Sequence, residues 1–369
     1  MRASTPVLRL AHAPPQSFDP SFSMQALVYL GPGQKELRDC PSPQLHHATD
    51  ALVDITRTTL CGTDLHILAG HVPSCAPGRI LGHEGVGVVT AVGDGVTTLT
   101  AGDQVLISCI TSCGRCEPCR RGMPSHCASG GWLLGNRIDG TQAETVRIPF
   151  ADTSLYRLPA GLDEERLVML SDVLPTGLEC GVLRGAVAPG TSVAIVGAGP
   201  IGLAAAMTAQ LWSPTQLVMI DPNEHRLGVA KALGASDLIS GSADEATAAV
   251  MLLTGGRGVD TVIEAVGTAP AFALCQDLVA AGGVIANVGV HGSKVELQLD
   301  RLWSRNVTIT TRLVDTLTIP MLLRLVAAGR LHPELLISHH FALGEIVAAY
   351  GVFADARHTH ALKVILAAG

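Results

Sequence analysis

A glycine-rich turn between a buried strand and an apolar helix constrains the fold of this chain most strongly. Residues 192–196 form a short apolar run that predicts a buried strand, and Gly197-Ala-Gly-Pro-Ile-Gly202 follows directly. In dinucleotide-binding βαβ units the first glycine allows a tight turn, the second lets the backbone approach a pyrophosphate, and the third lets helix pack on strand. The helix N-terminus then provides an anion site. The turn is therefore a predicted cofactor site formed by Gly197, Gly199, Pro200, Ile201 and Gly202.

An acidic residue stands where such a unit places its ribose-binding group. Asp221 ends the next expected strand, 216–220, about 20 residues beyond the glycines. Its carboxylate can accept hydrogen bonds from both ribose hydroxyls and repels a 2′-phosphate, which favours NAD over NADP. Arg226 is a candidate for the adenosine edge of the cofactor, and a solvated helix charge is the alternative.

Strands and helices continue to alternate after Asp221. Helices are expected at 244–253 and 268–280, and strands at 237–239, 259–264, 283–288 and 307–310. Six strands with intervening helices or crossovers predict a doubly wound Rossmann domain over residues 175–315.

Residues 24–174 show a different pattern, in which short β-branched strands are broken by glycine and proline. Strands expected at 25–30, 51–58, 85–93 and 102–107 indicate an antiparallel, loop-rich β domain. Two helices at 321–328 and 345–353 and a strand at 361–366 should fold back onto it, so that 316–369 complete this domain. A cleft between the domains would then bring metal ligands and cofactor together. Residues 1–23 are expected to be a disordered extension.

Four cysteines at short spacing predict a structural metal site. Cys113, Cys116 and Cys119 follow a Cys-x-x-Cys-x-x-Cys pattern, and Cys127 comes eight residues later. Four thiolates satisfy a tetrahedral zinc ion and leave no open position. Free core cysteines are disfavoured because the flanking residues are polar or turn-forming, and disulfides or a redox Cys-x-x-Cys are the alternatives. Cys109 lies just outside this spacing.

A second set of metal-ligand residues lies earlier in the chain, in Cys61-Gly-Thr-Asp-Leu-His66 and Gly82-His-Glu84. Cys61, His83 and Glu84 offer a thiolate, an imidazole and a carboxylate, all of which bind zinc. The hydroxyl of Thr63 begins a candidate proton path. Core or surface roles are the alternatives for each of these residues.

Composition excludes two classes of partner. Apolar residues make up 47% of the chain and the net charge is −7, with no basic run, which argues against a nucleic-acid binder. No stretch of about 18 uninterrupted apolar residues occurs, so no membrane span is expected. Ten cysteines, some closely spaced, in a large chain without a signal segment suit metal binding in a reducing cytosol.

These motifs together resemble the zinc-dependent medium-chain alcohol dehydrogenases. The resemblance covers nearly everything from Met24 to the C-terminus and rests on the segments 61–66, 82–87, 102–105, 113–127, 197–202 and 264–267. Residues 169–172 and 286–292 look like the bacterial branch near secondary-alcohol and formaldehyde-dehydrogenase-like enzymes. The resemblance implies an α/β fold with an irregular, β-rich, GroES-like catalytic domain and a Rossmann doubly wound parallel sheet. It also implies two zinc ions per chain and NAD.

The resemblance also assigns roles at the catalytic zinc. Cys61 and His83 are implied ligands, and Asp172 stands where many members have a third, cysteine ligand. Oxygen is a harder donor than thiolate, so a somewhat stronger Lewis acid is expected. Glu84 is a fourth ligand in some members and an outer group in others. The implied reaction is reversible hydride transfer from a primary or secondary alcohol to NAD+ through a zinc-bound alkoxide, with the proton leaving by Thr63 and His66.

Further cofactor and substrate contacts follow from the same resemblance. Lys363 sits where the family often has a basic residue against the pyrophosphate, and Gly62 replaces an arginine that some members use there. Three valines are assigned to the cofactor site, with plain strand packing as the alternative: Val266, Val288 and Val290. Trp132, Leu133 and Ile138 are expected in the substrate pocket.

Several functions remain open within this fold. The rivals to an alcohol dehydrogenase are a formaldehyde dehydrogenase or dismutase and a polyol or threonine dehydrogenase. No long insertion of the kind dismutases carry is seen between 218 and 286. A non-catalytic structural zinc protein is the alternative outside the enzymes. A small alcohol or aldehyde is the expected partner, and a cytoplasmic homotetramer is expected by analogy, with a dimer as the alternative.

Overall fold

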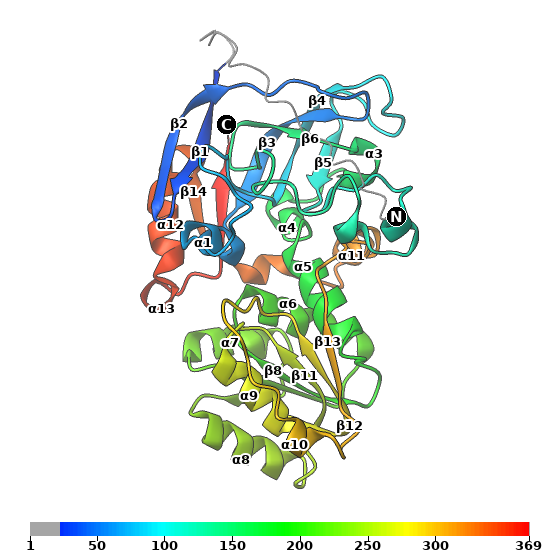
Figure 1. The fold of residues 1–369 in the computed structure, drawn as a ribbon, viewed down its shortest axis with the longest axis vertical. Coiled ribbons are helices and arrows are strands. Elements are labelled where there is room, and N and C mark those ends of the chain that lie inside the picture. Colours follow the sequence, from blue (N-terminus) through cyan, green and yellow to red (C-terminus); the bar gives the residue numbers. More distant parts are fainter. Residues whose placement is uncertain (1–22, 369) are drawn as a thin grey trace, which may run out of the picture.

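The computed structural model describes residues 23–368, which form a β-rich part and a Rossmann-type part joined by a helical connection (Figure 1). The predicted extension at 1–23 lies outside the described residues except for Ser23, which begins strand β1 (Ser23–Gly31). None of the helices in the described range is long and apolar enough to cross a membrane.

The Rossmann-type part contains a fully parallel six-stranded sheet with strand order β10-β9-β8-β11-β12-β13. This is the order of a doubly wound dinucleotide-binding sheet, so the predicted fold class is confirmed. The strands are β8 (Ser192–Val196), β9 (Gln216–Ile220), β10 (Asp237–Ile239), β11 (Val259–Glu264), β12 (Val279–Asn287) and β13 (Thr308–Thr311).

The crossover helices differ little from those expected. They are α6 (Pro200–Ala209), α7 (Glu224–Ala232), α8 (Ala243–Leu253), α9 (Ala269–Leu278) and the short α10 (Leu299–Leu302). Helix α9 ends at Leu278 and not at 280, because Val279 is already paired in the sheet with Val259. Strand β12 therefore begins four residues before the predicted start at 283.

The β-rich part contains a seven-stranded sheet, ordered β14-β15-β3-β4-β5-β7, with β6 also paired to β3. Its strands are β3 (Ala51–Thr59), β4 (Gly85–Val92), β5 (Gln104–Ile107), β6 (Thr145–Ile148), β7 (Leu155–Arg157), β14 (Ile337–Ala342) and β15 (Lys363–Ala367). Strands β1 and β2 (Gln34–Pro41) form a separate antiparallel hairpin. The C-terminal strand β15 pairs antiparallel with β3, so the tail folds back as expected.

Short helices complete the β-rich part. They are α1 (Gly62–Leu68), α2 (Glu117–Arg120), η2 (Pro124–His126) and α3 (Ala151–Ser154), and in the tail α11 (Ile319–Ala327), η5 (Pro333–Leu336), η6 (Leu343–Glu345), α12 (Ile346–Ala354) and α13 (Ala356–Thr359). The sequence predicted no helix at α1, where Gly62 and β-branched Thr63 lower the intrinsic propensity.

The connection between the two parts was not predicted as regular structure. It consists of α4 (Glu164–Val168), α5 (Val173–Thr176) and a π-helical segment, η3 (Gly177–Leu183). Buried Glu179 of η3 accepts hydrogen bonds from the backbone N–H groups of Asp315, Thr316 and Thr318, where the chain leaves the Rossmann sheet. One hydrophobic core runs through the connection, from Val86 and Leu106 of the β-rich part to Ile195 and Leu203 of the other. The two parts therefore share their packing.

The close approach of α6 to β8 depends on Gly202. A Cβ atom at this position would lie only 1.8 Å from the carbonyl oxygen of Gly197. Backbone cannot move away as a flexible side chain can, so only glycine fits.

We expect Gly202→Ala to lower the free energy of unfolding by about 1–3 kcal/mol, because overpacking displaces the helix from the turn. Gly228→Ala is the matched control, since Gly228 lies in helix α7 with open space around the added Cβ. It should stabilise the protein by about 0.5–1 kcal/mol through helix propensity. Urea unfolding measures both, and equal effects of the two changes would contradict the packing account.

Candidate metal and cofactor sites

Helix α1 positions the first candidate metal ligand. Cys61 is the residue before the helix, and its backbone N–H donates to Asp64 Oδ2 at 2.9 Å, which satisfies one of the open donors at the helix start. Thr63 and His66 are three residues apart in the same helix, so they lie on one face. The predicted ligand and the two predicted proton-path residues thus belong to one short element.

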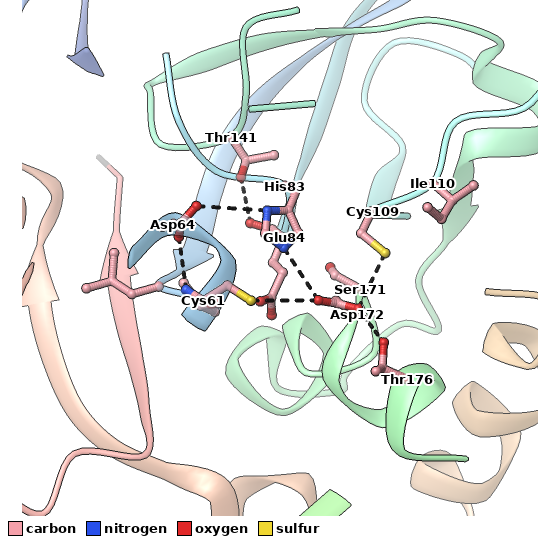
Figure 2. A network of polar contacts seen from close by, with 12 residues as sticks. Cys61, Asp64, His83, Glu84, Cys109, Ile110, Thr141, Ser171, Asp172 and Thr176 are labelled. Carbon is pink, nitrogen blue, oxygen red and sulfur yellow. Dashed lines mark hydrogen bonds and ion pairs between the residues drawn. The ribbon is translucent and has the colours of Figure 1, made fainter. Parts of the chain in front are cut away.

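Four candidate ligands meet at one buried centre (Figure 2). The ligand atoms of Cys61, His83, Glu84 and Asp172 all lie within 4.8 Å of one another. Asp172 Oδ2 is 3.9 Å from Cys61 Sγ and 3.4 Å from His83 Nε2. These residues come from the start of α1, from the segment just before β4, and from the residue preceding α5. The fold thus joins residues more than 100 positions apart.

Asp64 lies behind His83. His83 Nδ1 is 4.0 Å from Asp64 Oδ1, too far for a hydrogen bond, and both atoms are buried without a hydrogen-bond partner among the described residues. Nε2, on the other side of the ring, lies 3.4 Å from Asp172 Oδ2. The nearby Asp64 charge helps to raise the pKa of His83. Asp64 itself is held by Gln142 Nε2 at 2.9 Å. Sequence analysis missed Asp64, although its place within the Cys61–His66 motif was an available signal.

The charges at this centre fit a divalent cation. Burial raises the pKa of the Cys61 thiol. Burial also opposes ionisation of Asp172, but the hydrogen bond and charge of His83 lower its pKa to about 2. The pKa of His83 rises well above its ordinary value despite burial, because Cys61 and Asp172 favour its cation. A zinc ion bound here would displace the protons of Cys61 and His83 and meet thiolate, nitrogen and carboxylate donors, a set that suits zinc.

Lys363 does not lie where the resemblance placed it. Its side chain is buried, and Nζ donates to Glu84 Oε1 at 2.7 Å, Glu84 Oε2 at 2.9 Å and the carbonyl of Leu60 at 2.9 Å. The Glu84 carboxylate raises the pKa of this ammonium although burial opposes it. The assignment of Lys363 to a pyrophosphate contact is therefore corrected, because all three donors of the ammonium are used inside the protein.

The four-cysteine cluster forms a second candidate metal site. The sulfur atoms of Cys113, Cys116, Cys119 and Cys127 lie within 4.8 Å of one another, and none is in a disulfide. Backbone N–H groups of Ala128 and Cys119 lower the pKa of Cys116 to about 6, so a thiolate is favoured there. Four sulfur donors without an open position fit a structural zinc ion.

A cavity of about 880 Å³ lies at the glycine turn. It is lined by four of the predicted cofactor residues, Gly197, Asp221, Arg226 and Val266. Asp221 is anchored by the backbone N–H groups of Ala198 and Asn223, at 2.7 and 2.8 Å. Arg357 and His360, from the C-terminal tail, also line this cavity, and no local pattern in the chain indicated it. Gly199, Pro200, Ile201 and Gly202 form the adjoining start of α6.

Val288 and Val290 line a different cavity, of about 430 Å³, together with Met123 and Arg312. Val266 lines the other cavity, although Val290 lies directly beside Gly267, the residue after Val266.

Apolar groups surround the metal centre on one side. The Trp132 ring packs edge-on to His83 with centroids 6.2 Å apart, and Cys109 Sγ is 3.6 Å from Asp172 Oδ1. Cys109, Ile110, Cys180 and Val314 form one buried cluster, against which Trp132 and Val288 pack. Trp132 was expected near the substrate, whereas Cys109 and Ile110 were missed because only the fold brings them to Asp172.

Comparison with known proteins matches both parts of the chain. Residues 47–160 match the alcohol dehydrogenase GroES-like domain, and residues 200–328 match the zinc-binding dehydrogenase domain. An alcohol dehydrogenase of Cupriavidus necator is 35% identical, over 90% of this chain and 96% of that protein.

Two solved structures share the whole fold. Zinc-dependent alcohol dehydrogenase 2 from Streptococcus pneumonia is 48% identical, with a TM-score of 0.90 over 94% of this chain and 98% of that one. Alcohol dehydrogenase TADH from Thermus sp. ATN1 is 36% identical, with a TM-score of 0.86 over 93% and 99%.

We expect Lys363→Met to destabilise the protein by about 3–5 kcal/mol, because it leaves the buried Glu84 carboxylate without its cation. The double variant Glu84→Gln/Lys363→Met should lose clearly less, since no isolated charge remains. Urea unfolding of these two variants and of Glu84→Gln gives the free energies of unfolding for a double-mutant cycle. A double variant as unstable as the sum of the single ones would contradict a direct ion pair.

Proposed function

This chain belongs to the zinc-dependent medium-chain alcohol dehydrogenase family, and from this membership we propose that it oxidises a small primary or secondary alcohol with NAD+ to an aldehyde or ketone, reversibly. The observation that carries the proposal is the convergence of Cys61, His83 and Asp172 on one buried centre with an apolar wall. The dinucleotide cavity at Gly197 supports it.

Each residue at the centre has a distinct task. Cys61, His83 and Asp172 would hold the catalytic zinc, and Asp64 places a carboxyl group behind the His83 ring. Glu84 is held on Lys363, which makes it an outer group that steadies the centre. When bound, zinc supplies a Lewis acid to the alcohol oxygen and NAD+ accepts the hydride.

The proton of the alcohol leaves along one face of helix α1. Thr63 and His66 share that face, so the Thr63 hydroxyl can take the proton and pass it on towards His66. Burial and then the charge of His71 lower the pKa of His66, which favours its neutral form and makes it pass a proton on rather than retain it.

The choice of NAD depends on Asp221. Its carboxylate is fixed by two backbone donors and would repel a 2′-phosphate. Arg226, Arg357 and His360 line the same cavity and would contact the adenosine half of the cofactor. Val288 and Val290 are assigned to the nicotinamide half, with the carboxamide held by backbone groups.

The wall beside the centre favours an alcohol with a small apolar group. Trp132, Cys109, Ile110 and Val314 offer apolar surface and no charged partner for a polyol. We also propose a homo-oligomer, since Trp303 is 78% exposed and β13 is an edge strand of the sheet. A cytoplasmic location suits ten cysteines that are all free.

The deciding experiment measures cofactor reduction by the purified protein across alcohols of varied chain length and branching, with NAD and NADP side by side. We expect oxidation that prefers NAD, and about two zinc ions per chain for the two ligand groups. Absence of activity with every alcohol, together with one zinc or none, would overturn the proposal in favour of a structural protein. Protein purified with NAD already bound would favour a dismutase instead.

Thr63→Val keeps the shape of the side chain and removes its hydroxyl. We expect the rate of alcohol oxidation at pH 7 to fall about a hundredfold, the scale of a lost proton-transfer group. Zinc content and NAD affinity should stay unchanged. Thr90→Val is the matched control, because this exposed threonine bonds only to the Leu52 carbonyl. Near-full activity of Thr63→Val would contradict the proton path.

A further inference from the structure

A second imidazole lies against His66 at the end of helix α1. His66 Nδ1 and His71 Nδ1 are 3.3 Å apart, and the ring centroids are separated by 5.6 Å at an angle of 44°. His66 is partly buried, whereas His71 is exposed. The pair therefore joins a partly buried imidazole to one that is exposed to solvent.

The end of the helix fixes this pair geometrically. His71 N–H donates to the His66 carbonyl at 2.9 Å, and Gly70 N–H donates to the Ile67 carbonyl at 2.9 Å. Together with the left-handed Gly70 (φ +78°), these bonds make a Schellman motif. In this motif the side chain of the second residue after the helix cap contacts the side chain of the third-last residue of the helix. Here these two side chains are His71 and His66.

A hydrogen bond between His66 Nδ1 and His71 Nδ1 requires that the two nitrogens differ in protonation. Two Nδ1 atoms at this distance share a hydrogen bond only when one carries a proton and the other a lone pair. Neither imidazole bonds or pairs with a carboxylate within residues 23–368. The segment after β12 brings Gly292 close to His71, and the neighbouring His291 is bonded to Asn287 at 2.8 Å, with Glu264 at 3.5 Å.

We propose that His71 is the outer member of a two-histidine proton relay, a role that rests on the proposed function. In each oxidation the alcohol loses a hydride to NAD+ and its hydroxyl proton to Thr63. His66 receives that proton at Nε2, the nitrogen left free by the contact, and gives up the proton on Nδ1 to His71 Nδ1. His71 releases the proton on its other ring nitrogen to water, and exchange of tautomers through water then returns the proton of His66 to Nδ1 and that of His71 to Nε2 before the next turnover. His71 affects the reaction only through His66. We therefore class it as a positioning residue that serves proton release.

Two variants separate proton transfer from helix capping. His71→Gln keeps a hydrogen-bonding side chain that cannot titrate, and His71→Leu keeps the apolar contact that this helix end normally makes. His332→Gln is the control, because that exposed histidine pairs only with Glu334 on the surface. All three are measured as the zinc-loaded full chain, across pH and with added imidazole.

We expect kcat for alcohol oxidation below pH 7 to fall about tenfold in both His71 variants, below the full effect of a lost acid–base group. Free imidazole should restore most of the rate, while the His332 variant behaves like the parent. By NMR, the pKa of His66 should rise in His71→Gln, because a neighbouring cation no longer opposes its protonation.

Four results would count against the relay. Unchanged pH profiles in both His71 variants would overturn it while leaving the alcohol dehydrogenase intact. A loss that imidazole does not restore, or an unchanged pKa of His66, would reduce His71 to a structural contact. A parent protein without alcohol dehydrogenase activity would instead overturn the proposed function and the relay with it.

Discussion

The buried ion pair between Lys363 and Glu84 holds together the segments that carry the metal ligands. The ammonium bonds both Glu84 oxygens, next to His83, and the carbonyl of Leu60, next to Cys61. Two charges removed from water are tolerated only when each is fully paired, and that condition is met here. The last strand of the chain is thereby fixed against two segments from its first quarter, and the ligand positions depend on that closure.

Helix α1 carries several of the candidate functional residues on different faces of one short element. Cys61 at its start faces the metal centre, Asp64 turns inward behind His83, and Thr63 and His66 occupy another face. Its C-terminal motif adds His71. A helix this short has little intrinsic stability. It is held by the packing of Ile67 and Leu68 in the core and by the Asp64–Gln142 bond.

The connection around η3 links the metal centre to the dinucleotide sheet. Asp172 stands at its start, and Glu179 in its middle binds the segment through which the chain returns from the sheet. Asp315 in that segment also accepts from Ser125 beside the cysteine cluster. The catalytic centre, the cysteine cluster and the Rossmann sheet are thus joined through two buried carboxylates and one shared core.

Local pattern alone predicted the Rossmann sheet, the four-cysteine cluster and the candidate ligands Cys61, His83 and Glu84, each of which the structure brings together. Strand 192–196, the glycine turn and Asp221 each depend on steric and hydrogen-bonding needs of a few consecutive residues. Their roles can therefore be predicted from the sequence alone. The tertiary structure decided what depends on distant contacts: Asp64 behind His83, Cys109 beside Asp172, Arg357 in the cofactor cavity, and Lys363 on Glu84 and not on a pyrophosphate. The residue type of Lys363 does not show whether its ammonium contacts a phosphate or a carboxylate. Only the pairing of β15 with β3 brings its ammonium to a buried acid.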